Sequence, residues 1–155
     1  MILRRISFFV CCIMAVCLVA CISDKIYYHF QHVEGECWDR SDTIRFEVPT
    51  LREGGLFSKF IALRTNGDFR YRKLEVVVTQ EVFPAKYIKR DTVDINLIDG
   101  KGNISSGGIR FYQFEQSFGS VRLMKGDSLH ISINHNMRRE DLNGITDVGV
   151  CLRRK

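Results

Sequence analysis

The sequence predicts an all-β protein, a single antiparallel β-sandwich of jelly-roll type that follows a lipoprotein signal peptide and a short tether. Three observations support this fold class. From residue 43 onward, apolar and polar residues alternate with a period of two rather than 3.6. The apolar segments are short and fairly regularly spaced, and turns rich in glycine and asparagine separate them. Each segment has one polar face, which indicates two sheets packed against each other.

The first twenty residues have the features of an export signal. Arg4 and Arg5 precede an almost unbroken apolar run over 6–20, which is too short for a comfortable membrane-spanning helix. The run ends in Leu-Val-Ala-Cys at 18–21, which has the shape of a lipobox. We expect cleavage before Cys21 and lipidation of its thiol and new amine, giving about three chains in which each buried CH₂ contributes roughly 0.8 kcal/mol.

The alternatives are an ordinary signal peptide or an N-terminal anchor helix, with Cys21 an incidental thiol. The polar residues 23–25 directly after the cysteine favour the lipoprotein interpretation. The predicted organisation is therefore a cleaved signal peptide over 1–20, a lipidated tether and first strand over 21–36, and a β-sandwich domain over 37–155.

Length and charge limit the classes of function. Removal of 1–20 leaves 21 basic and 18 acidic residues, a net charge of +3, on a chain of single-domain length. So modest a charge argues against nucleic-acid binding. The basic tail 153–155 either contacts anionic head groups of a membrane or is a solvated end.

The predicted strands come at regular positions along the mature chain. The first strand lies within 22–36, and its large side chains are Tyr27, Tyr28 and Phe30. The others are predicted at 43–48, 57–63, 74–79, 93–97, 109–114, 121–124, 129–133 and 145–152. The segment 136–143 is predicted to be a helical turn that Gly144 ends.

The sequence offers no recognisable catalytic constellation. It contains no GxSxG, HExxH or CxxC motif and no glycine-rich phosphate loop after a strand. His29 and His32, like His130 and His135, lie at spacings that place the two members of each pair on opposite faces of a strand. We therefore expect no enzyme activity, no metal site and no cofactor.

Three aromatic residues form a candidate binding surface. Tyr112 and Phe114 are predicted to lie on the strand face opposite Phe111, and together with Trp38 they are candidates to bind a sugar or a protein. The alternative is that these aromatic side chains pack in the core. A disulfide between Cys37 and Cys151 is neither predicted nor excluded. Export to an oxidising compartment permits the bond, but the sequence does not show that the two thiols lie close together.

The segment 135–150 is the least generic part of the chain. A Met-Arg pair at Met137 and Arg138 is followed by Leu142 and then by Gly-Ile-Thr-Asp-Val-Gly at 144–149. This resembles the C-terminal signature of the gliding-motility lipoprotein H (GldH) family. The signature residues with expected structural roles are Arg138, Gly144, Asp147 and Gly149.

The resemblance extends backward over most of the mature chain. Trp38 followed by Asp42, the strand 44–48, and the segment 63–74 with its Leu-Arg-Thr-Asn start are similar to family motifs in order and spacing. The glycine-rich segment 99–120 departs from the family pattern, which puts in doubt any role of that loop in partner recognition.

The resemblance implies a lipid-anchored outer-membrane protein that acts as a non-catalytic structural or assembly subunit of an envelope machinery, with another envelope protein as its partner. The alternative function is that of a lipid-anchored carbohydrate-binding module, with a glycan as its ligand.

Overall fold

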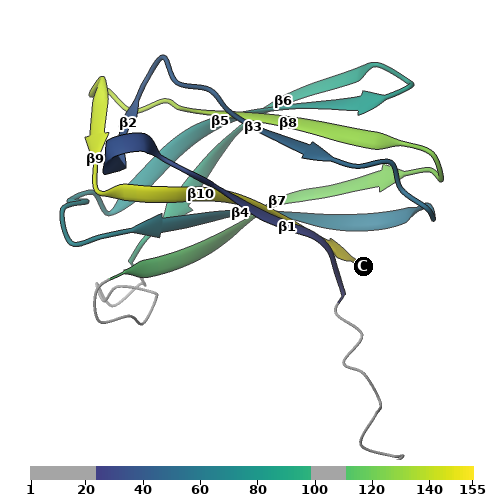
Figure 1. Ribbon diagram of the computed structural model, residues 1–155, viewed down its shortest axis with the longest axis horizontal. Coiled ribbons are helices and arrows are strands. Elements are labelled where there is room, and N and C mark those ends of the chain that lie inside the picture. Colours follow the sequence, from purple (N-terminus) through teal and green to yellow (C-terminus); the bar gives the residue numbers. More distant parts are fainter. Residues whose placement is uncertain (1–23, 99–110) are drawn as a thin grey trace, which may run out of the picture.

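The computed structural model describes residues 24–98 and 111–155, which form an antiparallel β-sandwich (Figure 1). Two four-stranded sheets pack face to face, and a two-stranded ribbon lies at one end. The predicted fold class is confirmed. The elements are β1 (Lys25–His32), η1 (Glu34–Glu36), β2 (Cys37–Asp39), β3 (Ile44–Val48), β4 (Gly55–Thr65), β5 (Lys73–Phe83), β6 (Tyr87–Asn96), β7 (Tyr112–Leu123), β8 (Ser128–His135), β9 (Asp141–Asn143) and β10 (Ile145–Arg154).

The strand pairing is that of a jelly roll. Strand β1 pairs with β10, β2 with β9, β3 with β8, β4 with β7 and β5 with β6, and every pair is antiparallel. The pairs are nested, so the chain is one long hairpin that turns between β5 and β6 and is rolled into two layers. Pairing of β10 with β4 and of β5 with β8 completes the sheet orders β1-β10-β4-β7 and β3-β8-β5-β6.

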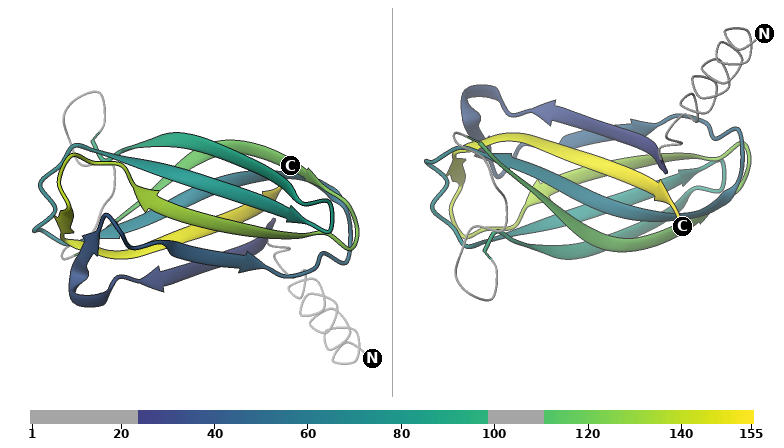
Figure 2. Two further views of the ribbon diagram at one scale, coloured as in Figure 1. Left: turned by 90° about the horizontal axis from the view of Figure 1, so that it is seen from above. Right: turned by 90° about the horizontal axis from the view of Figure 1, so that it is seen from below.

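The two ends of the sandwich carry different connections. The end that we call proximal holds the start of β1, the end of β10 and the loops 49–54, 84–86 and 124–127. There Lys25 pairs with Arg153, and the Lys155 N–H donates to the Leu56 carbonyl at 3.0 Å. The distal end holds η1, the ribbon β2–β9 and the loop 66–72, at the left in Figure 1. The views from above and below in Figure 2 show the same separation.

Strand β7 differs from the prediction. The structure has one strand over Tyr112–Leu123, where two strands at 109–114 and 121–124 were expected; Ile109 lies outside the described residues. The intervening residues are polar, but Glu115 and Ser117 lie exposed on one side of a continuous strand while Phe114 is buried. Gly119, at φ +94°, sits where the pairing with β4 shifts register, so the alternation changes face there.

The predicted helical turn over 136–143 is wrong. Strand β9 pairs instead with β2, and Leu142 lies directly opposite Trp38. Both side chains are buried, at 0 % and 1 % exposed. Burial of this cross-strand pair outweighs the local helical tendency of the segment.

The core lies between the two sheets and follows the strand alternation. In β5 and β8 every second residue is buried, so these strands present apolar rows to the opposite sheet. The fully buried aliphatic residues of these two rows are Leu74, Val76, Val78, Leu129, Ile131 and Ile133.

Strand β10 is buried on both faces. Val148 and Val150 face the core, whereas Gly149 lies under the aromatic ring of Phe30 from β1. A β-carbon at position 149 would lie 2.7 Å from that ring, so glycine permits the close approach. The Arg64 guanidinium lies 3.8 Å from the centre of the Phe30 ring and covers it in turn.

The two cysteines that the structure describes are free thiols. Cys37 begins β2 at the distal end, and Cys151 is buried in β10. The disulfide that the sequence left open is not formed.

One lysine lies in the core. Lys59 of β4 is in the inward row with Phe57 and Ile61 and is 1 % exposed. Its ammonium donates a hydrogen bond to the Gln80 side-chain oxygen from the opposite sheet. Burial, followed by the charge of Lys89, lowers the pKa of Lys59 to about 8.

The substitution Lys59→Met should alter how stability depends on pH. Between pH 8 and pH 10.5 Lys59 of the folded protein has released a proton that it still holds in the unfolded chain, so the contribution of Lys59 to wild-type stability rises with pH across this window. The rise attributable to Lys59 is at most about 3 kcal/mol. Urea unfolding followed by circular dichroism should show that Lys59→Met lacks this rise and is at least as stable as wild type at neutral pH.

The matched control is Lys125→Met, because Lys125 is exposed in the turn before β8. This variant should keep the wild-type pH dependence. Equal slopes for wild type and Lys59→Met would show that burial does not perturb this amine.

Candidate functional site

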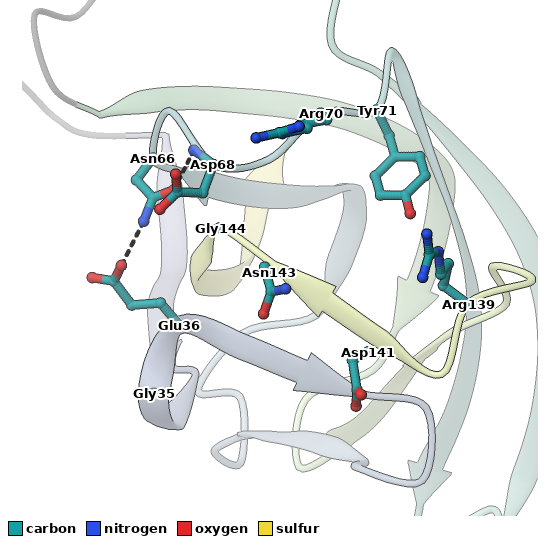
Figure 3. Close-up of a pocket in the computed structure, with 10 residues that line it drawn as sticks. All are labelled: Gly35, Glu36, Asn66, Asp68, Arg70, Tyr71, Arg139, Asp141, Asn143 and Gly144. Carbon is teal, nitrogen blue, oxygen red and sulfur yellow. Dashed lines mark hydrogen bonds between the residues drawn. The ribbon is translucent and has the colours of Figure 1, made fainter.

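A polar hollow of about 480 Å³ opens at the distal end of the sandwich (Figure 3). We call it the distal hollow. Its walls come from η1, from the loop between β4 and β5, and from β9 with the residues on either side of it. The lining residues are Gly35, Glu36, Asn66, Asp68, Arg70, Tyr71, Arg139, Asp141, Asn143 and Gly144.

Gly144 joins the three walls through its backbone. Its N–H donates to the Glu36 carbonyl at 2.8 Å, and its carbonyl accepts from the Asn66 N–H at 2.9 Å. Because η1, the β4–β5 loop and the end of β9 all meet at this residue, their relative positions depend on it.

Only glycine fits at position 144. Its φ is +89°, in the left-handed region that side chains disfavour. A β-carbon there would lie 2.2 Å from the Phe69 backbone nitrogen and 2.8 Å from the Asn66 side-chain oxygen. The sequence predicted a left-handed conformation here, but the close contact with the β4–β5 loop comes from the tertiary fold.

The opposite wall is a tight turn held by side chains. Gly35 and Glu36 both have positive φ, at 64° and 53°. This turn directs the Glu36 carboxylate to the Asn66 amide, which donates a hydrogen bond to it. Asn66 also accepts the Asp68 N–H at 2.8 Å through its side-chain oxygen, which closes the Asn-Gly-Asp turn at 66–68.

The ribbon beneath the hollow is fixed by Trp38 and His135. The indole N–H of Trp38 donates to the Asp42 carbonyl at 3.1 Å, and its ring meets the His135 ring edge-to-face at 5.4 Å. His135 Nε2 lies 3.1 Å from the Glu140 carbonyl, and its Nδ1 accepts from the Met137 N–H. These contacts fit a neutral imidazole, and burial lowers the pKa of His135. The histidine thereby holds the segment 136–140, which carries an arginine of the hollow.

The rim of the hollow is charged. Arg70 and Arg139 are exposed, and no ion pair in the described part of the chain involves either of them or Asp68. Figure 3 shows Arg70 and Tyr71 along the upper edge of the opening, Arg139 close to Tyr71, and Asp141 below Arg139. Guanidinium, carboxylate, amide and phenol groups therefore face a common space, which suits recognition of a polar, charged surface.

The structure corrects the predicted aromatic surface. Trp38 and Phe114 are 1 % and 6 % exposed and belong to the core, and Tyr112 is half-buried at the start of β7. Phe111, which was expected to face the core, is exposed. The prediction assigned the two faces of this segment the wrong way round. Phe111 lies before β7, and within β7 it is Phe114 that points into the core. Two of the three residues behind the carbohydrate-binding alternative are thus unavailable to a ligand.

The other predicted residues lie at separate places. Cys21 is outside the described residues. Arg138 is exposed, and its neighbour Arg139 lines the hollow instead. Asp147 in β10 accepts from the Thr146 hydroxyl at 2.9 Å and lies 3.5 Å from His32 of β1. Gly149 accommodates Phe30, so within the signature only Gly144 belongs to the hollow.

Sequence reasoning missed most of the hollow. Glu36, Asn66 and Arg139 come from three segments far apart in the chain. The Asn-Gly-Asp turn and Gly144 are visible in the sequence as separate local features. No local pattern shows that they lie next to each other in the fold.

The described residues hold neither a metal-binding cluster nor a membrane-spanning helix. Within 24–98 and 111–155, no group of three or more His, Cys, Asp or Glu side chains is arranged to hold a metal ion. No helix in the same residues is long and apolar enough to cross a membrane.

Comparison with known proteins gives the family. A family model described as GldH lipoprotein matches residues 25–152, which is most of the chain. The chain belongs to the GldH lipoprotein family. The resemblance seen in the sequence is thereby confirmed, and this GldH homologue is a lipoprotein that a lipid anchor attaches to a membrane.

Two curated relatives match over nearly their whole lengths. Gliding motility lipoprotein GldH of Flavobacterium johnsoniae is 22% identical over 148 residues, covering 91% of this chain and 92% of the relative. The GldH homolog of Christiangramia forsetii is 25% identical over 141 residues and 84% of each chain.

Solved structures of other proteins match at low identity and low TM-score. Eiger TNF from S. frugiperda is 9% identical, with a TM-score of 0.38 over 84% of this chain and 93% of that chain. The Podospora anserina GH26-CBM35 β-(1,4)-mannanase is 11% identical, with a TM-score of 0.41 over 83% of this chain and 28% of that chain.

The substitution Gly144→Ala should destabilise the distal end strongly. The added methyl group collides with the Phe69 backbone and requires an unfavourable φ, and we expect a loss of about 3 kcal/mol in the free energy of unfolding. Chemical denaturation measures this loss. Gly67→Ala in the facing turn is the matched control, because a β-carbon there meets nothing within 4 Å, and it should change stability little. Comparable losses in the two variants would contradict the role given to Gly144.

Proposed function

We propose that this protein is a non-catalytic assembly subunit of a gliding-motility machinery, anchored to the outer membrane through lipidated Cys21, and that its distal hollow binds another envelope protein. The observation that carries this proposal is the position of the hollow. It opens at the end of the sandwich opposite the start of β1, so a lipid attached just before β1 leaves the hollow directed away from the bilayer.

The tether between lipid and sandwich is very short. Cys21 is four residues before Lys25, the first residue of β1. A fully extended chain of that length spans at most about 14 Å. A lipid on Cys21 would therefore keep the proximal end within that distance of the membrane surface.

The composition of the proximal end supports contact with lipid. Tyr87 and Ile88, at the start of β6, are 60 % and 61 % exposed. Met124, in the loop between β7 and β8, is 65 % exposed. Lys86 and Lys125 are exposed beside them in the sequence. Aromatic and apolar side chains next to lysines are typical of segments that rest on a membrane interface with anionic head groups.

The composition of the distal hollow supports a protein partner and a non-catalytic role. Its lining contains no serine, threonine, cysteine or histidine, so it offers no hydroxyl or thiol nucleophile beside an imidazole base. Arg70 and Arg139 are exposed cations without an ion-pair partner in the described residues. Arginine is enriched at protein interfaces, where it pairs with carboxylates of the partner.

Two further observations support the location and the process. Ile22 stands after Cys21, in the place where an aspartate would signal retention in the inner membrane. Both curated relatives carry gliding motility in their names, and this chain matches them over most of its length.

The partner site can be tested by crosslinking in intact cells. A photo-crosslinking amino acid at Asp68, on the rim of the hollow, should yield one dominant crosslinked envelope protein, which mass spectrometry identifies. Adding Arg139→Glu should lower the yield of this product about tenfold, because reversing an interfacial charge repels the carboxylate that it contacts.

The matched control is Arg90→Glu, since Arg90 is exposed on β6 and does not line the hollow. It should leave the yield unchanged. Cys21→Ser should move the protein out of the membrane fraction, which tests the anchor separately. Equal yields in the Arg139→Glu and Arg90→Glu variants would rule out the hollow as the partner site.

A further inference from the structure

A second cavity, of about 420 Å³, lies at the proximal end. Its lining comes from β4 and β7 of one sheet and from β5, β6 and β8 of the other, so it lies between the sheets near their β6–β7 side. The lining residues are Lys59, Gln80, Val82, Ala85, Tyr87, Lys89, Ser120, Val121, Arg122, Asp127 and Leu129. We call it the proximal cavity.

The deepest charged group of the proximal cavity is the ammonium of Lys59. The residue is 1 % exposed, and strand alternation directs it inward. It donates to Gln80 and lies 4.6 Å from the centre of the Phe118 ring. No carboxylate in the described residues lies within ion-pair distance of it.

Asp91, the acidic group whose charge acts on Lys59, already has partners. Asp91 accepts a hydrogen bond from the Gln80 amide at 3.1 Å and pairs with Lys89 at 3.0 Å. The Asp91 carboxylate is therefore paired with Lys89. Gln80, which is hydrogen-bonded to both side chains, connects Asp91 to Lys59. A buried cation without a counter-ion is costly, so the site favours an incoming anion.

The remaining walls carry both positive charge and apolar surface. Lys89 and Arg122 also line the cavity, and Asp127 is the one acidic residue in this lining. The Asp127 carboxylate accepts the Met124 N–H at 2.8 Å, which closes the turn before β8. Val82, Ala85, Val121 and Leu129 supply apolar surface. A cavity of this size that places apolar surface beside cationic groups suits a small molecule with an apolar part and an anionic part.

We propose that the proximal cavity binds an amphiphile that has one anionic group, a carboxylate or a phosphate monoester, held by Lys59, and a short apolar body that lies against Val82, Val121 and Leu129. Because burial lowers the pKa of Lys59 only to about 8, its ammonium is predominantly charged at neutral pH and is able to pair with this anion. The anion supplies the counter-charge that the core lacks.

Two sources provide this chemistry, a free single-chain amphiphile or the head group of an anionic membrane lipid. The cavity lies at the end from which β1 starts, so lipid reaches it only if the membrane orientation in the proposed function holds. Binding of a free amphiphile does not depend on that orientation.

The test uses the full-length lipidated protein in phosphatidylcholine nanodiscs, titrated with sodium hexanoate in a calorimeter, with empty nanodiscs subtracted. We expect saturable binding of hexanoate, and much weaker binding of hexan-1-ol, which lacks the charge, and of acetate, which lacks the tail. Lys59→Met should weaken hexanoate binding by about tenfold or more, because a charged hydrogen-bonding partner is lost. Val121→Trp, which narrows the cavity and leaves the lysine intact, should weaken it similarly.

Arg90→Met is the matched control, because Arg90 is exposed on β6 and does not line the cavity. It should bind hexanoate like wild type. Repeating the titration in nanodiscs that contain phosphatidic acid, whose head group is a phosphate monoester, separates the sources. Unchanged affinity assigns the site to a free amphiphile, whereas affinity reduced by competition in wild type assigns it to a lipid head group.

Two outcomes would overturn the proposal. One is the absence of hexanoate binding to the wild-type protein in phosphatidylcholine nanodiscs. The other is binding that Lys59→Met and Val121→Trp leave intact. Neither outcome affects the distal partner site, because that site is probed by crosslinking at the opposite end.

Discussion

The antiparallel ladder between β1 and β10 connects the two ends of the chain, and the sandwich depends on it. Strand β1 is at the edge of its sheet and pairs only with β10, whereas β10 lies between β1 and β4. Packing reinforces this ladder, since Phe30 lies on Gly149 and Arg64 of β4 covers Phe30. A lipid attached before β1 would therefore act on the sandwich through this ladder. Any pull on the anchor would pass to a central strand that is buried on both faces.

The nested pairing also separates the two ends of the molecule. Short loops join consecutive strands at the proximal end, which also holds both ends of the described chain. At the distal end the chain adds η1 and the ribbon β2–β9, and these additions create the walls of the distal hollow. Gly144 links the ribbon to the main sheets by donating to Glu36 and accepting from Asn66. In the proposed function, the membrane lies at one end and the partner at the other, and the sandwich separates the two.

Lys59 is the one charged residue in the inward row of β4. The neighbouring inward residues, Phe57 and Ile61, are fully buried. Lys59 is accommodated because the side-chain oxygen of Gln80, in the opposite sheet, accepts its hydrogen bond. The Gln80 amide in turn donates a hydrogen bond to Asp91. A hydrogen-bonded amide compensates only in part for the loss of water around an ammonium. This residual cost distinguishes the proximal cavity from an ordinary packing defect.

The sequence by itself determined the fold class, the family and most strand positions. The period of two along the chain reports which residues face inward, and this pattern is local, so β3, β4, β5, β8 and β10 were expected close to where they lie. Tertiary contacts decided the rest. Trp38 and Leu142 are buried because β2 and β9 pair across more than a hundred residues of chain, which converts an apparent helical turn into a strand. The distal hollow and the proximal cavity are likewise lined by side chains from several segments of the chain. A local pattern cannot show which distant segments become neighbours, because only the nested strand pairing brings them together.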